Sequence, residues 1–193
     1  MRYRVEKAEV IFKEFFTIER AAVSWEQFDG RMGPIQTRYT VRRGRSVGII
    51  PVFTPADRIA LVKQFRYPTA GDGFDGFLWE IPAGMVHGTE SPEETARREL
   101  EEEIGLRTQD LTPLMSFYLS PGALDEMFHL FLARVPPDFR VRPVGGNRAE
   151  EENLLIRVFS KAELLSMIRE QQIVDAKTIT ALLYYFCSDN LHR

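Results

Sequence analysis

The chain has 193 residues, of which 44% are hydrophobic and 27% are charged, an ordinary composition for a globular protein. Its net charge of −3 at pH 7 argues against a general affinity for nucleic acid, and its single cysteine excludes an intrachain disulfide framework. Neither a signal peptide nor an apolar run of membrane length is recognisable, so we expect a cytoplasmic protein with no membrane partner.

The N-terminal part of the chain differs from the remainder. Residues 10–23 and 35–42 are strand-like, and a turn-rich stretch at 29–34 separates them. This pattern predicts a hairpin or a small antiparallel sheet. We therefore expect two domains, an N-terminal β segment at residues 1–45 and a main domain at residues 46–193.

The main domain alternates strand-like and helix-like segments. Strands are expected at residues 46–55, 59–65, 77–82, 114–119, 128–135 and 154–159. Helices are expected at residues 92–104, 161–171 and 176–187. This mixture favours an α/β fold with a mixed sheet covered by helices on both faces. Cys187 ends the last helix and is expected to be a buried thiol.

Clear start and stop signals bound the first expected helix. Ser91 suits the N-cap, Pro92 the first helical position, and Glu94 completes a capping box. Gly105 stands where a C-cap glycine belongs. The signals therefore predict one continuous helix from Pro92 to Ile104.

Three glutamates border the apolar stripe of this helix. Glu99 and Glu103 lie one turn apart, and Glu102 is beside them, although like charges at this spacing repel. An acidic helix face is usually only solvated. A hard divalent cation is the other explanation, because Mg²⁺ prefers oxygen ligands and bridges carboxylates to substrate phosphates.

The surrounding segment favours the metal. Nine fixed positions of a known pattern are filled, by Gly84, Glu90, Arg98, Glu99, Leu100, Glu102, Glu103, Gly105 and Leu106. The segment resembles a complete Nudix box, the signature of hydrolases that cleave nucleoside diphosphates linked to another group. The resemblance implies the Nudix α/β/α sandwich with a mixed β-sheet, preceded here by the N-terminal antiparallel β segment. It also implies a Mg²⁺ cofactor, with Mn²⁺ as an alternative.

The same resemblance implies roles for residues of the box. Glu99 and Glu103 would be the main metal ligands, the latter central to catalysis. Glu102 and the backbone carbonyl of Ala83 would assist, and Arg98 would orient the glutamates. Glu80, just before the box, is a further candidate for the metal shell and the substrate site.

Features outside the box narrow the choice of substrate. Pro121 follows Leu106 by fifteen residues within Ser-Pro-Gly, Gln-Phe-Arg-Tyr stands at 64–67, and Ile-Val-Asp-Ala-Lys-Thr stands at 173–178. These features are similar to the ADP-ribose pyrophosphatase subfamily. The resemblance implies hydrolysis of ADP-ribose to AMP and ribose 5-phosphate by a homodimer with exchanged N-terminal segments.

Substrate contacts follow from the same resemblance. Phe15 or Phe16 would stack on adenine, Arg38 and Arg43 would meet the nucleotide, Arg66 would meet the phosphates or the terminal ribose, and Glu126 would meet the terminal ribose. Arginine and aromatic side chains suit such contacts. The alternatives are that both phenylalanines belong to a strand core, that Arg42, Arg43 and Arg45 form a solvated strand end, and that the Ser-Pro-Gly containing Pro121 is an ordinary turn.

The general base is expected in the loop between Gly145 and Asn153. The acidic candidates are Glu150, Glu151 and Glu152, and Glu152 fits best by its distance from the following strand. A run of three loop glutamates is also compatible with simple solvation. Relatives often carry a second acidic residue where this chain has Leu154, so the base and a third metal ligand stay open.

Two other functions compete with ADP-ribose hydrolysis. Relatives with similar motifs use another nucleoside diphosphate sugar, such as GDP-mannose or a UDP-sugar. A Nudix-like domain can also bind a nucleotide and regulate without hydrolysis, but such domains typically lose box glutamates, and this chain retains all of them.

Overall fold

The computed structural model describes residues 1–71, 73–147 and 152–191, and the chain divides into two compact units. The N-terminal unit comprises Met1–Gly44 together with Tyr118–Met127. The larger unit comprises Arg45–Phe117 and Phe128–Arg193. A segment far along the chain thus completes the N-terminal unit.

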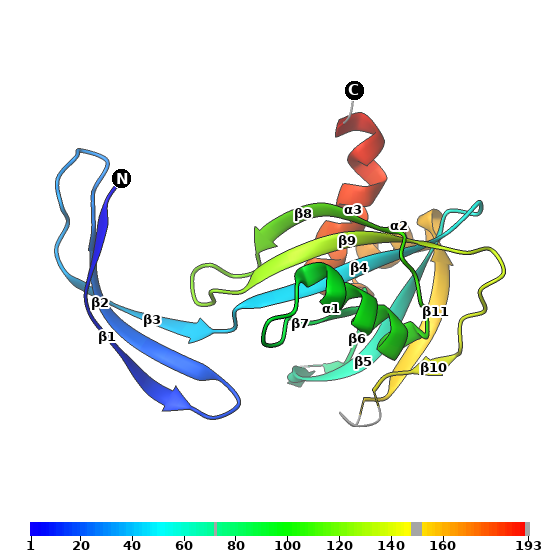
Figure 1. Cartoon of the computed structure of the whole chain (residues 1–193), viewed down its shortest axis with the longest axis horizontal. Helices are drawn as coiled ribbons and strands as arrows, with labels where there is room; N and C mark the ends of the chain where they lie inside the picture. The colour runs from blue at the N-terminus through cyan, green and yellow to red at the C-terminus, as the bar shows by residue number, and fades with distance from the viewer. Residues whose placement is uncertain (72, 148–151, 192–193) are drawn as a thin grey trace. The chain divides into compact units, whose positions relative to one another are not determined.

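The N-terminal unit is an antiparallel sheet of β1 (Tyr3–Lys13), β2 (Thr17–Trp25) and β3 (Gln36–Arg42), in the order β1-β2-β3 (Figure 1). The expectation of an antiparallel β segment is confirmed. The expectation of a single strand over residues 10–23 was wrong. The chain reverses at residues 14–16, where the Glu14 amide donates to the Phe16 carbonyl. That turn contains no glycine, proline or asparagine, the residues that usually mark one.

The larger unit is built on one curled mixed sheet. Its strands are β4 (Arg45–Phe53), β5 (Arg58–Gly71), β6 (Phe74–Glu80), β7 (Ala83–Met85), β8 (Leu111–Tyr118), β9 (Met127–Val135), β10 (Val144–Gly145) and β11 (Leu154–Ser160). The main order is β10-β11-β5-β4-β9-β8, while β6 pairs with β5 and β7 with β4. The pairing of β7 with β4 places the start of the box directly on the sheet.

Helices cover both faces of this sheet. They are α1 (Pro92–Glu99), α2 (Lys161–Arg169) and α3 (Ala176–Leu191). Residues 46–52 of β4 are all buried, which requires cover on both faces. Val47 and Ile49 share a core with Ala96 of α1 and with Leu100, which directly follows α1, and α3 also contacts β4 (Figure 1). The α/β/α expectation is confirmed.

The first helix differs from its expected form. Ser91 and Glu94 make the expected capping box. The α-helix, however, ends at Glu99, and Leu100–Ile104 forms a π-helical turn, η1, closed by Gly105 in the left-handed conformation (φ 75°). The expected bounds of the helix, Pro92 to Ile104, are confirmed, but its last turn is π-helical. Single π turns are wider than α turns and occur mostly at functional sites.

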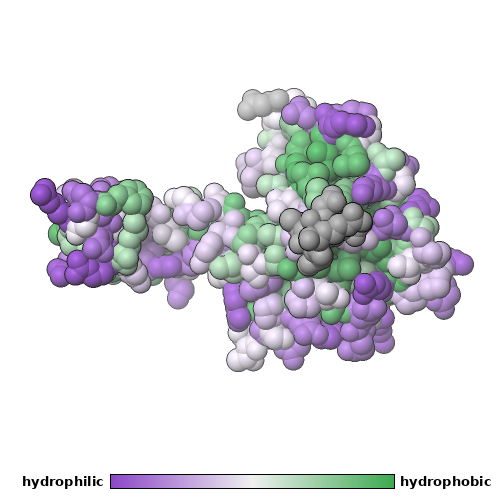
Figure 2. Space-filling model, turned by 90° about the horizontal axis from the view of Figure 1, so that it is seen from above, coloured by the Kyte–Doolittle hydropathy of each residue, from purple (hydrophilic) through white to green (hydrophobic). Residues whose placement is uncertain are grey.

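The surface of the larger unit mixes hydrophilic areas with one hydrophobic area on the face shown in Figure 2. Cys187 of α3 is exposed, so the expectation of a buried thiol was wrong. The buried side of that helix carries Ala181 and Leu182 instead. Among the described residues, no helix is long and apolar enough to cross a membrane.

Candidate active site

The box glutamates lie at the edge of the helix that packs on the sheet. Glu99 ends α1 and is 7% exposed, and Glu103 in η1 is 1% exposed. Ala96, Leu100 and Ile104 belong to the buried core, so the same packing that buries them draws the neighbouring carboxylates out of water. Burying a carboxylate is costly unless it is paired.

Glu103 is the least compensated of these carboxylates. Its Oε2 atom is buried and has no hydrogen-bond partner among the described residues. Burial raises the pKa of Glu103 well above its usual value, and the negative charges of Glu99, Glu152 and Glu80 raise it further, against the opposing effect of Arg66. This part of the larger unit therefore has an excess of negative charge.

Glu99 lies against the loop that enters the box. A Cβ atom built on Gly84 would lie 1.8 Å from Oε1 of Glu99, so only glycine leaves room for this carboxylate. Gly84 is held there by the pairing of β7 with β4, opposite Val47. Burial raises the pKa of Glu99 to about 7, although Arg98 acts in the opposite direction.

Arg98 connects the carboxylates of the box. Its Nη1 lies 2.8 Å from Glu99 Oε1 and 3.0 Å from Glu102 Oε2, and its Nε lies 3.4 Å from Glu90 Oε1. Its Nη2 donates to the carbonyl of Met85. One guanidinium thereby holds three glutamates and the β7 backbone, an arrangement suited to orienting metal ligands.

A second charged cluster lies at the end of β6. Glu80 is 1% exposed and accepts hydrogen bonds from Arg66 Nε at 2.8 Å, Arg66 Nη2 at 2.9 Å and Lys177 Nζ at 3.1 Å. Burial on its own would raise the pKa of Glu80, but the two cations outweigh burial and lower it. Glu80 is therefore ionised in this structure.

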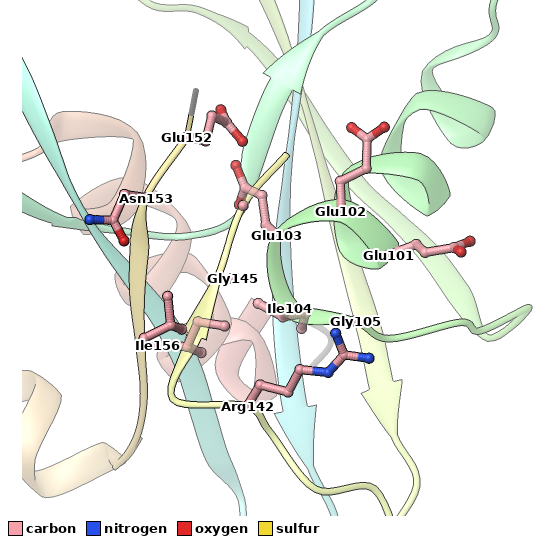
Figure 3. A pocket seen from close by; sticks show the side chains of 12 residues that line it. Glu101, Glu102, Glu103, Ile104, Gly105, Arg142, Gly145, Glu152, Asn153 and Ile156 are labelled. Carbon is pink, nitrogen blue, oxygen red and sulfur yellow. The ribbon is translucent and has the colours of Figure 1, made fainter. Parts of the chain in front are cut away.

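A pocket of about 530 Å³ opens beside η1, lined by η1, β10 and the start of β11 (Figure 3). Glu103 and Glu152 both line it, and their carboxylates point toward one another in Figure 3. The Glu152 carboxylate accepts a hydrogen bond from the backbone amide of Asn147 at 3.0 Å. The other two candidate bases, Glu150 and Glu151, lie outside the described residues.

The chemistry of these side chains suits a divalent cation. Within the described residues, no three His, Cys, Asp or Glu side chains are already gathered into a metal-ligand set. Glu103 Oε2 is nevertheless buried without a partner, and Gly84 leaves space for the Glu99 carboxylate. Oxygen donors of this kind are the ligands that Mg²⁺ and Mn²⁺ prefer.

The remaining candidate substrate residues belong to the N-terminal unit. Phe15 is 85% exposed and meets Phe16 edge to face, so the alternative of a strand core does not hold for Phe15. Arg43 lies over the Phe16 ring at 5.3 Å, and its Nε is 3.5 Å from Glu126 Oε2.

Arg38 lies elsewhere on the same sheet. Its guanidinium lies over the ring of Trp25 at 5.0 Å and also bonds the side chain of Gln36. Pro121 lies in an exposed turn. Arg43, Phe16 and Glu126 thus form one group, whereas Arg38 contacts Trp25 and Gln36.

The NUDIX domain model matches residues 42–182 of this chain. The chain belongs to the Nudix family. That match covers the whole sheet of the larger unit together with α1, η1 and α2.

Relatives within the family agree with this assignment. The ADP-ribose pyrophosphatase of Bacillus subtilis (strain 168) is 35% identical over 152 residues, which are 79% of this chain and 77% of the relative. The GDP-mannose pyrophosphatase of Yersinia enterocolitica is 32% identical over 180 residues, 92% of each chain. A crystal structure titled an ADP compounds hydrolase has the same fold, with a TM-score of 0.74 at 20% identity, covering 98% of this chain and 96% of that one.

Two features of this Nudix site were missed from sequence. Lys177 and Asp175 join the Glu80 cluster from α3, almost a hundred residues further along the chain. The sequence of the stretch 173–178 predicts the subfamily but assigns no role to Asp175 or Lys177. The contact of Arg43 with Phe16 and Glu126 carries no local signal, because three separate segments supply it.

Proposed function

We propose that this Nudix enzyme hydrolyses ADP-ribose to AMP and ribose 5-phosphate, with Mg²⁺ as its cofactor and Mn²⁺ as an alternative. The observation that carries the proposal is the buried Oε2 of Glu103, which has no hydrogen-bond partner in the described part of the chain and faces the negative charges of Glu99 and Glu152. The Bacillus subtilis relative, named an ADP-ribose pyrophosphatase, supports the choice of substrate.

In this proposal the ion is held by Glu99 and Glu103, assisted by Glu102 and the carbonyl of Ala83. A bound divalent ion neutralises and orients the diphosphate and lowers the pKa of water. Arg98 keeps the glutamates in position through its contacts with Glu99 and Glu102. Because Glu99 and Glu103 have raised pKa values, ion binding has to displace their protons.

Glu152 is the proposed general base, with Glu151 as the alternative outside the described residues. Glu152 takes a proton from water, the water oxygen bonds to one phosphorus, and the bridging P–O bond breaks with its electron pair on the departing phosphate. Glu152 is suited to this because it lines the pocket opposite Glu103 (Figure 3). The Asn147 amide orients its carboxylate.

The remaining assignments concern the substrate and the assembly. We propose that Phe15, Arg38, Arg43, Pro121 and Glu126 contact the nucleoside or the terminal ribose. Arg66 contacts the phosphates or the terminal ribose, and Glu80 is a further candidate for the metal shell. The protein acts as a cytoplasmic homodimer in which the β segment, residues 1–45, serves dimerisation and substrate contact, while residues 46–193 form the hydrolase domain.

A substrate panel tests the proposal. Purified protein is incubated with Mg²⁺ and ADP-ribose, GDP-mannose, UDP-glucose, NADH, diadenosine polyphosphates or dNTPs, and phosphate is scored after coupling to alkaline phosphatase. The highest kcat/KM is expected for ADP-ribose. A higher kcat/KM for another compound in the panel would overturn the substrate assignment but would be consistent with the proposed mechanism of diphosphate hydrolysis.

GDP-mannose is the second candidate substrate, because the Yersinia enterocolitica relative that carries this name aligns over 92% of the chain. The two candidates differ in the base, so the panel separates them directly. Nucleotide binding without hydrolysis of any compound would instead favour a regulatory role.

A further inference from the structure

The buried carboxylate of Glu80 has two cationic partners. Arg66 meets it with two nitrogens, at 2.8 and 2.9 Å, and Lys177 meets its Oε2 at 3.1 Å. A buried carboxylate is destabilising unless an opposite charge compensates it, and Glu80, whose side chain is 1% exposed, has two cations beside it. The second cation therefore needs an explanation.

Lys177 is more buried than Arg66 and has one more ion-pair partner among the described contacts. The Lys177 side chain is 18% exposed and is also bonded at 2.6 Å to Asp175, whose own side chain is 11% exposed. The Arg66 side chain is 40% exposed and has Glu80 as its ion-pair partner among the described contacts. Arg66 also lies where β5 leaves its regular pairing with β6, after the pair Phe65 and Phe77. Such irregular strand positions re-aim a side chain.

Lys177 is anchored by the start of α3. Asp175 accepts hydrogen bonds from the amide and the hydroxyl of Thr178, and so caps the helix. The Thr178 hydroxyl in turn accepts a bond from the amide of Ile81, the residue after Glu80. Thr178 thus links the start of α3 to Ile81, directly after β6. This link keeps Lys177 beside Glu80 whether or not Arg66 is there.

We propose that Lys177 is a positioning residue that keeps Glu80 compensated while Arg66 leaves it to bind the substrate diphosphate. This inference rests on the proposed diphosphate hydrolysis. Arg66 is the cation open to solvent, and a guanidinium binds phosphate oxygens in the same two-pronged way in which it binds Glu80. Without Lys177, the departure of Arg66 would leave the buried carboxylate of Glu80 with no cation beside it, so Arg66 would stay on Glu80.

The test replaces Lys177 and separates binding from turnover. Lys177→Met should raise KM for ADP-ribose about tenfold with kcat within about twofold of wild type, because a contact made equally in the ground and transition states is lost. Lys177→Arg keeps the cation and should behave as wild type. Lys161→Met, at an exposed lysine of α2, is the matched control and should change neither constant.

A double variant guards against a folding defect. Glu80→Gln with Lys177→Met removes the anion together with its cation, so Arg66 is no longer held and no buried charge is left alone. Its affinity for the non-hydrolysable α,β-methylene analogue of ADP-ribose, measured by calorimetry, should lie within about threefold of that of Glu80→Gln alone, because Lys177 is not needed once the anion is gone. Thermal unfolding checks that each variant is folded.

Three results would overturn the role of Lys177. These are an unchanged KM in Lys177→Met, a loss confined to kcat, or a double variant that binds the analogue clearly more weakly than Glu80→Gln. If the wild-type protein prefers another nucleoside diphosphate sugar, the same variants are measured with that compound, so the two proposals fail separately. A wild-type protein that hydrolyses none of them overturns the proposed function.

Discussion

Gly84 and Glu99 are in direct contact: the carboxylate of Glu99 occupies the space that any side chain at position 84 would need. Gly84→Ala should therefore displace the Glu99 carboxylate while leaving the core intact. Because small displacements of reacting groups are expensive, we expect kcat/KM to fall by about 100-fold. Gly88→Asn is the control, since Gly88 lies in the same loop with open space around it and asparagine tolerates its positive φ. Equal activity of the two variants would contradict the assignment of Glu99.

Glu103→Gln should abolish most turnover and leave the fold intact. The substitution removes a charge at a buried position whose Oε2 has no partner, without changing the shape of the side chain. We expect kcat to fall by about two orders of magnitude or more, as for the loss of a metal-site contact. Steady-state kinetics with Mg²⁺ measure the loss of turnover, and a circular dichroism spectrum checks that the fold is intact. Full activity would exclude a metal role for Glu103.

The stability of the metal-free protein should fall as the pH rises from about 5 to about 8. The pKa of Glu99 is raised from 4.5 to about 7 in the fold, so the folded state holds a proton that the unfolded state has released. At roughly 1.36 kcal/mol per pKa unit, the loss across this window is about 3 kcal/mol from Glu99. Glu80 has a lowered pKa, and its contribution is lost only at lower pH.

Urea unfolding in EDTA at several pH values measures this trend. Glu99→Gln should reduce the slope of stability against pH, because the amide does not titrate, whereas Glu103 keeps its raised pKa. Mg²⁺ should reverse it, since the ion binds the deprotonated carboxylates and stabilises the folded state by mass action. A wild-type protein whose stability in EDTA is level across the window would show that the carboxylates are not buried as described.

Arg98→Lys should lower the affinity for Mg²⁺ more than it lowers the stability of the folded protein. Arg98 reaches Glu99, Glu102 and the Met85 carbonyl together, and a lysine cannot make these contacts at once. We expect Mg²⁺ affinity, measured by calorimetry, to fall about 10-fold to 100-fold. Arg97→Lys is the matched control, because Arg97 forms its ion pair with Glu93 on the neighbouring helix face. Similar losses in both variants would point to a general effect on α1.

Ser160→Ala should lower stability without affecting turnover. Ser160 caps α2 and shares a capping box with Glu163, well separated in sequence from the Nudix box. Losing such a cap costs about 1 kcal/mol, which for a chain of this size lowers Tm by roughly 2–4 °C. Ser166→Ala, inside the same helix, should change Tm by less than half of that amount. A larger effect at position 166 would contradict the capping argument.

Local signals predicted most of the elements, and the failures have identifiable causes. The capping box at Ser91 and the terminator Gly105 bound the first helix correctly, because both act within a single turn of chain. The π turn between them was not predicted, since no residue type encodes it. The reversal at residues 14–16 was missed because it contains none of the usual turn residues.

The sequence by itself determined the family, the α/β/α class and the acidic helix edge, because the box pattern, the period of its apolar stripe and its caps are all properties of neighbouring residues. Only the tertiary structure decided how each carboxylate is held. Packing α1 and η1 on the sheet buries Glu103 and raises its pKa, whereas β5 and α3 each place a cation, Arg66 and Lys177, on Glu80 and lower its pKa. Burial and charge pairing depend on segments far apart in the chain, so the same residue type received opposite pKa shifts at two positions.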